Sequence, residues 1–436
     1  MSETFKNQQQ ILAKLGITTL NPMQEQALLT IPAYPNTILL SPTGTGKTLA
    51  FLLPVLNELK IELQQVQLII LVPSRELAIQ IEQVIRDMGT GFKANAVYGG
   101  RPISKDKIEL SHTPAILIGT PGRVLDHLDR KSFNLEYIRT VVLDEFDKSL
   151  EVGFENEMAH IMHDLAHVKR RVLTSATQNM KIPDFVKLHH PKVIDYTASG
   201  VKELAVKRVL ATHKDKLKTL VELLSHIGNE PGIIFCNYKD SINYLSEHLA
   251  THHIEHGIFH GGLEQQERER ALIKFRNGTY QIIIATDLGA RGLDIPELKY
   301  IIHYQLPLKA EEFTHRNGRT ARMNAAGTAY VLQWNKEIVP DFITTDDLLV
   351  LDPKTTSLET DWTTLFISGG RKDKISKGDI AGLFFKQGRL EKNELGVIEL
   401  KQDCAFVAVS KKKVHEVISS TNNTRLKKKK VRIYEV

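Results

Sequence analysis

The chain has 436 residues, enough for two to four domains that each bury a hydrophobic core. Its 42% hydrophobic and 25% charged residues are typical of a soluble globular protein and exclude a disordered one. No apolar run is as long as a membrane-spanning helix, and the N-terminus lacks the apolar segment of a signal peptide. The two cysteines lie far apart in the sequence, and neither belongs to a cluster with the spacing of metal ligands. We therefore expect a cytoplasmic protein with no membrane partner.

The net charge of +6 is unevenly distributed along the chain. Residues 371–436 hold 17 Lys and Arg against 8 Asp and Glu, a balance of +9, so the preceding residues carry −3. This asymmetry predicts a C-terminal module that binds a polyanion. A solubilising tail is the alternative.

The first predicted strand, Thr37–Leu40, leads into a glycine-rich turn, Ser41–Thr48. Such a turn directs backbone N–H groups towards an anion. Lys47 is expected to bind the β- and γ-phosphates of a nucleotide, and Thr48 to ligate Mg²⁺. An ordinary glycine-rich turn is the alternative. The residues assigned to the nucleotide are Thr43, Gly44, Thr45, Gly46, Lys47 and Thr48.

A later strand, Val141–Leu143, ends in two carboxylates, Asp144 and Glu145. Ligands of open parallel sheets bind at the carboxyl ends of the strands. Asp144 is expected to hold Mg²⁺ through water, and Glu145 to orient and deprotonate the attacking water. A solvated acidic turn would be the simpler interpretation of this pair alone. Together with the phosphate loop, the pair predicts a nucleoside triphosphatase.

Strand-like and helical segments alternate through the first 200 residues, which indicates a doubly wound parallel sheet. The alternation resumes after a predicted linker at 198–205, without a second phosphate loop. The predicted domains are residues 1–200, 205–345 and 363–436, with a connection at 346–362. The other predicted strands are Leu68–Val72, Ala94–Val97, Ala115–Ile118, Arg171–Leu173, Gly232–Phe235, Glu255–Phe259, Gln281–Ala285, Tyr300–His303 and Thr328–Leu332.

The C-terminal module has a βαββαβ pattern, which predicts a fold like an RNA-recognition motif. Phe366 and Phe406 are candidates for stacking on bases, although both fit a core equally well. Lysine clusters are the better candidates for RNA, with solvated helix ends as the alternative. The strands are Thr363–Ser368, Leu395–Leu400, Ala405–Val409 and Val431–Val436, the helices Lys377–Lys386 and Lys411–Ser420, and the lysine clusters Lys411–Lys413 and Lys427–Lys430.

Nine motifs in one order make the chain similar to the DEAD-box RNA helicases over nearly its whole length. They are Ser41–Thr48, Pro73–Gln80, Gly99–Gly100, Thr120–Arg123, Asp144–Asp147, Ser175–Thr177, Gln265–Arg268, Ala285–Pro296 and His315–Arg322. In addition, Lys374–Ile380 resembles the C-terminal domain of bacterial DbpA-type helicases, which directs those enzymes to ribosomal RNA. The resemblance implies an α/β protein with two tandem RecA-like doubly wound parallel-sheet domains and a C-terminal α+β domain like an RNA-recognition motif.

The resemblance also implies roles around ATP and Mg²⁺. Arg319 and Arg322 resemble arginine fingers, which stabilise charge on the transferred phosphoryl group. Three residues apart, they could both face one side of a helical turn. If they come from the second domain, hydrolysis requires the domains to close. The other implied residues are His315 in catalysis, Gln24 on the adenine, Gly292, Asp294 and Arg322 on the nucleotide (Asp294 on its ribose), and Asp147, Ser175 and Thr177 in coupling.

An RNA helicase grips the sugar-phosphate backbone without reading bases. Each candidate arginine could otherwise be an ordinary surface residue. The residues implied at the RNA are Ser74, Arg75, Gly100, Thr120, Arg123, Arg268 and Thr286, together with Lys427, Lys428, Lys429 and Lys430 of the C-terminal module.

Several positions depart from the family pattern. Phe146 replaces a small residue in the acidic motif and needs space beside the site. The other departures are Ser41, Ser74, Asn317 and Ala321. None removes a charge, so activity is expected to be retained. Phe5 is a candidate for stacking on adenine, with a helix-end anchor as the alternative.

We therefore predict an ATP-dependent RNA helicase that separates short duplexes by bending one strand as ATP closes the cleft. Its expected partner is duplex or structured RNA, with ribosomal RNA in ribosome assembly as the candidate, and the protein is expected to be a monomer. An ATP-gated clamp on a ribonucleoprotein is the alternative, and a DNA helicase is disfavoured by the C-terminal module.

Overall fold

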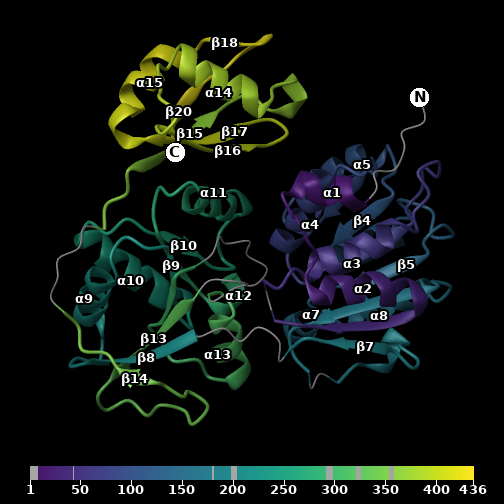
Figure 1. The fold of residues 1–436 in the computed structure, drawn as a ribbon, viewed down its shortest axis with the longest axis horizontal. Coiled ribbons are helices and arrows are strands. Elements are labelled where there is room, and N and C mark those ends of the chain that lie inside the picture. The colour runs from purple at the N-terminus through teal and green to yellow at the C-terminus, as the bar shows by residue number, and fades with distance from the viewer. Residues whose placement is uncertain are drawn as a thin grey trace. The chain divides into compact units, whose positions relative to one another are not determined.

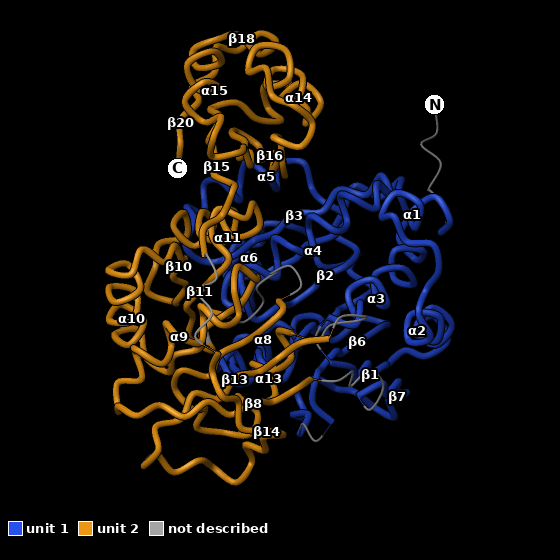
Figure 2. The backbone as a smooth tube through the Cα atoms, turned by 60° about the vertical axis from the view of Figure 1, so that its left-hand side comes forward, with its two compact units in different colours: residues 1–202, 291–294 blue, residues 203–290, 295–436 orange. Residues whose placement is uncertain are grey.

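The computed structural model describes residues 8–42, 44–178, 181–197, 204–290, 298–320, 326–352 and 358–436. They divide into two compact units, one from the N-terminal half of the chain and one from the rest (Figure 2). No helix among the described residues is both long enough and apolar enough to cross a membrane. The predictions for Phe5, Thr43, Gly292, Asp294, Ala321 and Arg322 lie outside the described residues.

Seven parallel strands form the sheet of the first unit, in the order β3-β4-β2-β5-β6-β1-β7. Figure 1 labels β4, β5 and β7 of this sheet. The strands are β1 (Asn36–Leu40), β2 (Leu68–Leu71), β3 (Ala94–Val97), β4 (Ile116–Gly119), β5 (Thr140–Leu143), β6 (Arg170–Ser175) and β7 (Lys192–Asp195). The helices are α1 (Gln8–Leu15), α2 (Pro22–Ala33), α3 (Lys47–Leu56), α4 (Arg75–Met88), α5 (Ile103–Leu110), α6 (Pro121–Asp129), α7 (Phe146–Val152) and α8 (Glu155–Asp164).

Both faces of this sheet are buried, because neighbouring residues of each strand enter different cores. Leu39 and Ile70 pack with apolar residues of α1, α2, α3 and α4. Ile38 and Leu71 pack on the other face with residues of α6, α7 and α8. Continuous apolar runs are typical of such doubly covered parallel strands. Ser41 and Asp144 lie at the carboxyl ends of the strands. Ligands of open parallel sheets bind at this edge.

The sheet of the second unit repeats this topology, in the order β10-β11-β9-β12-β13-β8-β14. Its strands are β8 (Leu204–Ala211), β9 (Gly232–Phe235), β10 (Gly257–Phe259), β11 (Ile282–Ala285), β12 (Tyr300–His303), β13 (Gly327–Trp334) and β14 (Asp347–Leu348). Its helices are α9 (Leu217–Ile227), α10 (Lys239–Thr251), α11 (Gln265–Arg276), α12 (Asp287–Ala290) and α13 (Ala310–Asn317). Counted from its first strand, each sheet has the same strand order, which is the repeated RecA-like layout expected from the sequence.

Three strands of these two sheets were not predicted. β7 is largely exposed, and β14 has two residues, so neither has the apolar run used to identify the others. β8 begins at Leu204, at the end of the linker expected near residues 198–205. β8 pairs in parallel with β13 over eight residues, a long-range contact that local sequence does not show.

A four-stranded antiparallel sheet, in the order β16-β17-β15-β20, forms the C-terminal module. Its elements are β15 (Trp362–Ile367), α14 (Lys377–Lys386), β16 (Leu395–Leu400), β17 (Ala405–Ser410), α15 (Val414–Thr421), a hairpin of β18 (Arg425–Leu426) and β19 (Lys429–Lys430), and β20 (Ile433–Glu435). Leu365 and Val407 pack with α14 and α15 on one face. This arrangement confirms the predicted α+β fold.

The end of α11 contacts this sheet through buried polar groups. Thr364 accepts a hydrogen bond from the Asn277 side chain at 3.1 Å, and its hydroxyl lies 2.7 Å from that of Thr279. Arg276 forms a bidentate pair with Glu399 at 2.7 and 3.1 Å. Glu399 and Thr364 belong to different strands, so the contact spans part of the sheet.

Candidate nucleotide and RNA sites

The phosphate loop joins β1 to α3, and two of its glycines adopt positive φ. Gly44 has a φ of +82° and Gly46 a φ of +86°, a conformation that residues with a side chain rarely adopt. A Cβ on Gly46 would also lie 2.4 Å from Nε2 of Gln24. Glycine is therefore required there both by the backbone and by the packing. The turn leaves the first N–H groups of α3 at the sheet edge, where an anion can accept their hydrogen bonds.

Lys47 is the first residue of α3 and is buried. Its Nζ donates hydrogen bonds to the carbonyl oxygens of Ser41 at 2.5 Å and Pro42 at 3.3 Å. Burial lowers the pKa of Lys47 to about 8, and the positive charge of Lys148 adds to this, while Glu145 and Asp144 oppose it. The ammonium is thus held inside the loop by neutral acceptors that a phosphate can replace.

Asp144 follows β5 and is also buried. Its Oδ1 accepts hydrogen bonds from the Thr174 hydroxyl and, at 3.0 Å, from the backbone N–H of Glu145. Burial raises the pKa of Asp144 to about 6, helped by the negative charge of Glu145. Thr174 of β6 was not identified from the sequence, because only the pairing of β5 with β6 brings it next to Asp144.

Glu145 has a φ of +47° and caps α7. Its carboxylate forms an ion pair with Lys148 at 2.9 Å. The Lys148 side chain is buried, and the sequence analysis did not assign it a role. Its spacing of three residues from Glu145 on a helix would have been the available signal. Phe146 between them is buried in the core with α6 and α8.

Gln24 lies on α2, buried against the phosphate loop. Its Nε2 donates to the carbonyl of Gly46 at 3.2 Å, and its Oε1 accepts from the N–H of Asn21 at 3.0 Å. The Asn21 side chain donates to the carbonyl of Thr45 at 3.0 Å. Two residues of the Asn21–Gln24 capping box therefore hold the loop from outside, a role that the sequence analysis did not predict.

The residues predicted to couple the site to closure lie together. Oδ2 of Asp147 accepts hydrogen bonds from the Thr177 hydroxyl at 3.3 Å and from the Ala176 N–H at 3.4 Å. Ser175 contacts Thr177 instead of Asp147, since its Oγ accepts from the Thr177 N–H at 3.0 Å. The link from α7 to the end of β6 thus passes through Thr177.

The closing motif of the second unit begins on a helix. α13, which carries His315, ends at Asn317, and Arg319 lies in the hydrogen-bonded turn after it, where its N–H donates to the Arg316 carbonyl at 3.0 Å. The shared face expected for Arg319 and Arg322 stays a prediction, because Arg322 lies outside the described residues. Thr320 explains the ending, because it forms a bridge with Leu298 and donates its hydroxyl to that carbonyl. Arg319 is buried.

Arg316, which was given no role from the sequence, is almost completely buried in the second unit. It forms a bidentate pair with Asp287 at 2.7 and 2.6 Å. It also donates to the Gln305 carbonyl and to the Asn237 side chain, both at 2.7 Å. These bonds make Arg316 a structural residue that joins three loops at the sheet edge.

The RNA candidates of the first unit gather around one glycine turn. Ser74 caps α4, where its Oγ accepts from the Leu77 N–H at 3.2 Å. The Arg75 guanidinium packs directly against Gly100. If Gly100 had a Cβ atom, that atom would lie 2.3 Å from Nη1 of Arg75. Thr120 begins the turn into α6, and Arg123 of α6 donates to the carbonyl of Arg101.

In the second unit, Arg268 and Thr286 lie on different elements. The Arg268 guanidinium lies 4.8 Å from the centre of the Phe259 ring, a cation–π contact. Thr286 precedes α12, and its Oγ1 accepts from the Gly289 N–H at 3.1 Å.

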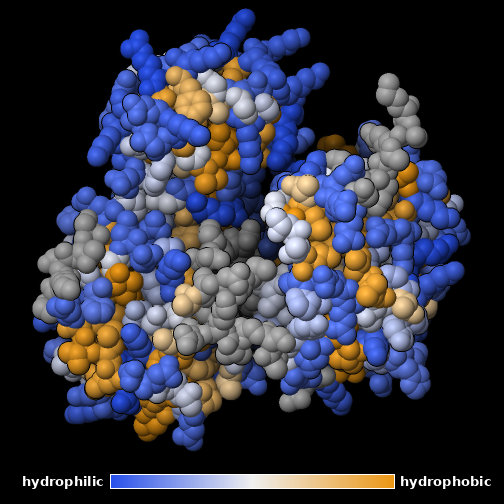
Figure 3. All heavy atoms as spheres, in the orientation of Figure 1, coloured by the Kyte–Doolittle hydropathy of each residue, from blue (hydrophilic) through white to orange (hydrophobic). Residues whose placement is uncertain are grey.

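The lysine cluster of the C-terminal module, Lys427–Lys430, forms the turn and the second strand of the hairpin of β18 and β19. Lys427 pairs with Asp379 at 3.0 Å and Lys429 with Asp373 at 2.8 Å. Lys428 and Lys430 are exposed. Hydrophilic side chains cover much of the module on the face drawn in Figure 3. The four lysines are therefore not equivalent, which the sequence did not reveal.

Phe366 and Phe406 lie on the sheet face opposite the helices of this module, with ring centres 5.5 Å apart. Tyr434 of β20 adds a third ring, 4.9 Å from Phe366 and 48% exposed. Phe406 is buried, so Tyr434 is the more accessible ring, and it was not selected from the sequence.

Three protein families match successive parts of the chain. The DEAD/DEAH box helicase family matches residues 21–185. The helicase conserved C-terminal domain matches residues 215–324, and the DbpA RNA binding domain matches residues 364–435.

Two relatives match this chain over nearly their whole length. The ATP-dependent RNA helicase DbpA of Escherichia coli (strain K12) is 30% identical, with 97% of this chain and 95% of that protein covered. The protein of the same name from Bacillus subtilis (strain 168) is 28% identical, with 98% of each covered. The structure of S. cerevisiae Dbp5 bound to RNA and ADP BeF3 is 31% identical, with a TM-score of 0.66, covering 75% of this chain and 86% of that one.

Proposed function

The chain belongs to the DEAD-box family of ATP-dependent RNA helicases, and from this premise we propose how its residues carry out the reaction. The observation that carries the proposal is one sheet edge that holds a buried lysine in a phosphate loop, Lys47, a buried carboxylate, Asp144, and a partly exposed one, Glu145. Lys47 is the cation for the phosphates, and Glu145 is the base for water.

In this proposal the triphosphate of ATP replaces the carbonyl acceptors of Lys47. A water oxygen then bonds to the γ-phosphorus while the bond to the bridging oxygen of ADP breaks, and Glu145 takes the water proton. The ion pair with Lys148 keeps the Glu145 carboxylate oriented before the step. Arg319 of the second unit stabilises charge on the transferred group when ATP is bound.

Mg²⁺ fits the same site. A buried carboxylate beside a second one is a site of surplus negative charge, and Asp144 with the Thr48 hydroxyl offers the oxygen ligands that this ion prefers. When bound, Mg²⁺ would neutralise charge on the β- and γ-phosphate oxygens.

Strand displacement tests the proposed function. A short RNA duplex with one labelled strand should separate in the presence of ATP, Mg²⁺ and the protein, and remain paired with a non-hydrolysable ATP analogue. Stable RNA binding with the analogue, but no displacement with ATP, would replace unwinding by clamping.

We further propose that the C-terminal module directs the enzyme to structured RNA, with ribosomal RNA as the candidate, and that the protein acts as a cytoplasmic monomer. The support is the +9 charge balance of residues 371–436 and the match to the DbpA RNA binding domain. The exposed lysines Lys428 and Lys430 are the proposed phosphate contacts.

Changing Lys428 and Lys430 together to Ala should reduce the slope of log affinity against log salt by about two, since each phosphate contact contributes about one. The matched control changes Lys427 and Lys429, whose charges are already paired, and should alter the slope less. Equal slopes for the parent and both variants would remove the hairpin from the RNA site. Comparing ribosomal fragments with unrelated structured RNA of the same length tests the target class.

A further inference from the structure

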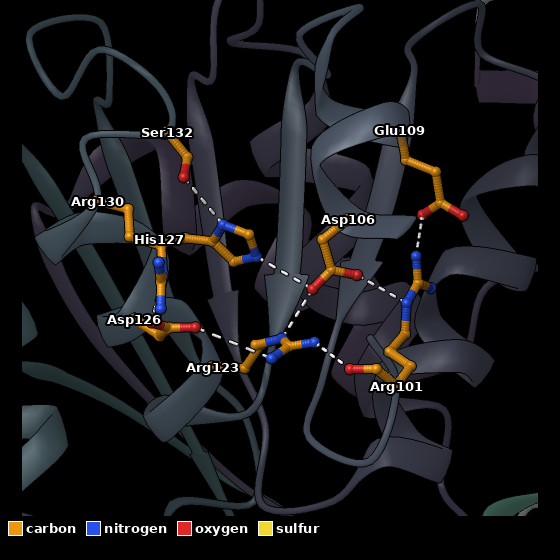
Figure 4. A network of polar contacts seen from close by, with 8 residues as sticks. All are labelled: Arg101, Asp106, Glu109, Arg123, Asp126, His127, Arg130 and Ser132. Atoms are coloured by element: carbon orange, nitrogen blue, oxygen red, sulfur yellow. Dashed lines mark hydrogen bonds and ion pairs between the residues drawn. The ribbon is translucent and has the colours of Figure 1, made fainter. Parts of the chain in front are cut away.

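Asp106 of α5 is a buried carboxylate surrounded by cations, and it lies outside the nucleotide site. Its Oδ1 is 2.7 Å from Nε of Arg101, and its Oδ2 is 2.7 Å from Nε of Arg123. The same Oδ2 is 3.1 Å from Nε2 of His127, whose other ring nitrogen lies 3.0 Å from the Ser132 hydroxyl. Figure 4 shows Asp106 between Arg101 on one side and Arg123 and His127 on the other.

The contacts join two segments that are separate in sequence. Arg101 directly follows the Gly99–Gly100 turn, whereas Arg123 and His127 belong to α6. Arg123 also donates through Nη2 to the backbone carbonyl of Arg101, so its guanidinium is bound to both the carboxylate and the turn. Its side chain is only 13% exposed.

Asp106 is ionised in this setting. Burial alone would raise its pKa, but the hydrogen bond with His127 and the charges of Arg101 and Arg123 outweigh burial and lower the pKa. The carboxylate therefore neutralises two guanidinium groups that would otherwise repel each other at close range.

We propose that Asp106 is a positioning residue for RNA binding, which holds the Gly99–Gly100 turn against the N-terminus of α6. The turn faces Arg75, and Gly100 has a φ of +89°, so a shift of a few tenths of an ångström would disturb a tightly packed arrangement. The N-terminus of α6 presents backbone N–H groups, which bind phosphate when held in place. The inference rests on the proposed RNA site of the first unit and deepens it.

Asp106→Asn tests the proposal in the full-length protein, because it removes the charge and keeps the shape. The RNA concentration that gives half-maximal ATPase stimulation should rise at least about tenfold, the factor that a lost hydrogen bond to a charged group carries. The affinity for ATP without RNA should stay at the parental value. The matched control is Asp126→Asn, which removes a carboxylate 3.8 Å from the same Arg123 guanidinium but 33% exposed, and should change RNA dependence less than about twofold.

A double-mutant cycle separates positioning from simple contact. If Asp106 acts through Arg123, then Asp106→Asn, Arg123→Gln and the double variant should raise the half-saturating RNA concentration by similar factors. Additive effects, or a parental value for Asp106→Asn, would overturn the proposal. Should Asp106→Asn fail to fold, the charge-balanced Asp106→Asn with Arg101→Gln replaces it in the same measurement, with the same expected rise and the same overturning result.

Arg75→Ala distinguishes this inference from the proposed function. A rise in half-saturating RNA for Arg75→Ala with none for Asp106→Asn would reject the positioning role and keep the RNA site. An ATPase of the parental protein that does not respond to RNA would reject the RNA function itself.

Discussion

The two units have the same strand order but use equivalent positions differently. In the first unit Lys47 begins the helix after the first strand, and in the second unit Lys216 immediately precedes α9, the helix after the first strand. Both lysines are buried, and burial lowers the pKa of both. Lys47 binds two loop carbonyls, whereas Lys216 binds the Leu332 carbonyl and the Glu337 carboxylate, each at 3.0 Å.

The difference lies in what a ligand can displace. A phosphate can replace the two carbonyl groups that accept hydrogen bonds from Lys47. The carbonyl groups are neutral, whereas the phosphate brings a negative charge to the ammonium. Lys216 already has a carboxylate partner and a carbonyl from β13, so an incoming anion would gain little there. The shared topology therefore supplies the position of a ligand edge, and the local side chains decide whether the edge binds a nucleotide.

The largest test asks whether the second unit contributes to the chemistry. Arg319→Ala should lower RNA-stimulated ATP turnover by about three orders of magnitude, the scale of an arginine finger. Single-turnover hydrolysis measures this. Arg316→Gln is the control from the same motif, and it should instead lower the free energy of unfolding by about 3–5 kcal/mol, because it breaks a buried pair with Asp287. A loss of only a few-fold for Arg319→Ala would make that residue structural too.

The next test compares the carboxylates next to the two lysines. Glu145→Gln should leave ATP binding intact and lower turnover by about two orders of magnitude, the scale of a general base. Glu337→Gln, the mirrored change in the second unit, should leave turnover unchanged. Steady-state hydrolysis and nucleotide titration give both quantities. Parental turnover in Glu145→Gln would exclude Glu145 as the base.

The pH dependence should report the two buried groups of the first unit. Since kcat/KM for ATP reflects the free enzyme, it should fall about tenfold per pH unit below about 6, where Asp144 becomes protonated. It should fall again above about 8, where Lys47 loses its charge.

Thr174→Val sharpens this test. The Thr174 hydroxyl stabilises ionised Asp144, so its loss should raise the pKa of Asp144 and move the acid limb to higher pH. An acid limb that stays at the same pH in this variant would assign it to another group, such as the ATP phosphates.

The smallest effect on catalysis is expected for Lys216→Met. The ammonium is buried, and its partners among the described residues belong to its own unit, so turnover per folded molecule should remain parental. The free energy of unfolding should fall by about 1–3 kcal/mol, because the Leu332 carbonyl and Glu337 lose their donor. Chemical denaturation measures this, and a loss of nucleotide binding would show that the second unit has a site of its own.

Most of the sheet architecture could be predicted from the sequence, because apolar runs such as Val141–Leu143 are buried whatever lies beside them. The prediction failed where a strand depends on its neighbour. β7 is mostly exposed, and β8 has Lys207 and Arg208 in its middle and is stabilised by pairing over eight residues with β13. The predicted domain boundaries, including the connection at 346–362 before the third domain, remain a prediction.

By itself the sequence determined the nature of the nucleotide chemistry, because a phosphate loop needs glycine, lysine and threonine in one short stretch. The sequence also determined the position of Asp144 and Glu145, because they directly follow the apolar strand Val141–Leu143. Only the tertiary structure showed that Thr174, Lys148 and Asp106 contact the charged groups of Asp144, Glu145 and Arg123. Buried charges interact over a few ångströms, and folding brings together residues whose separation along the chain gives no sign of that contact.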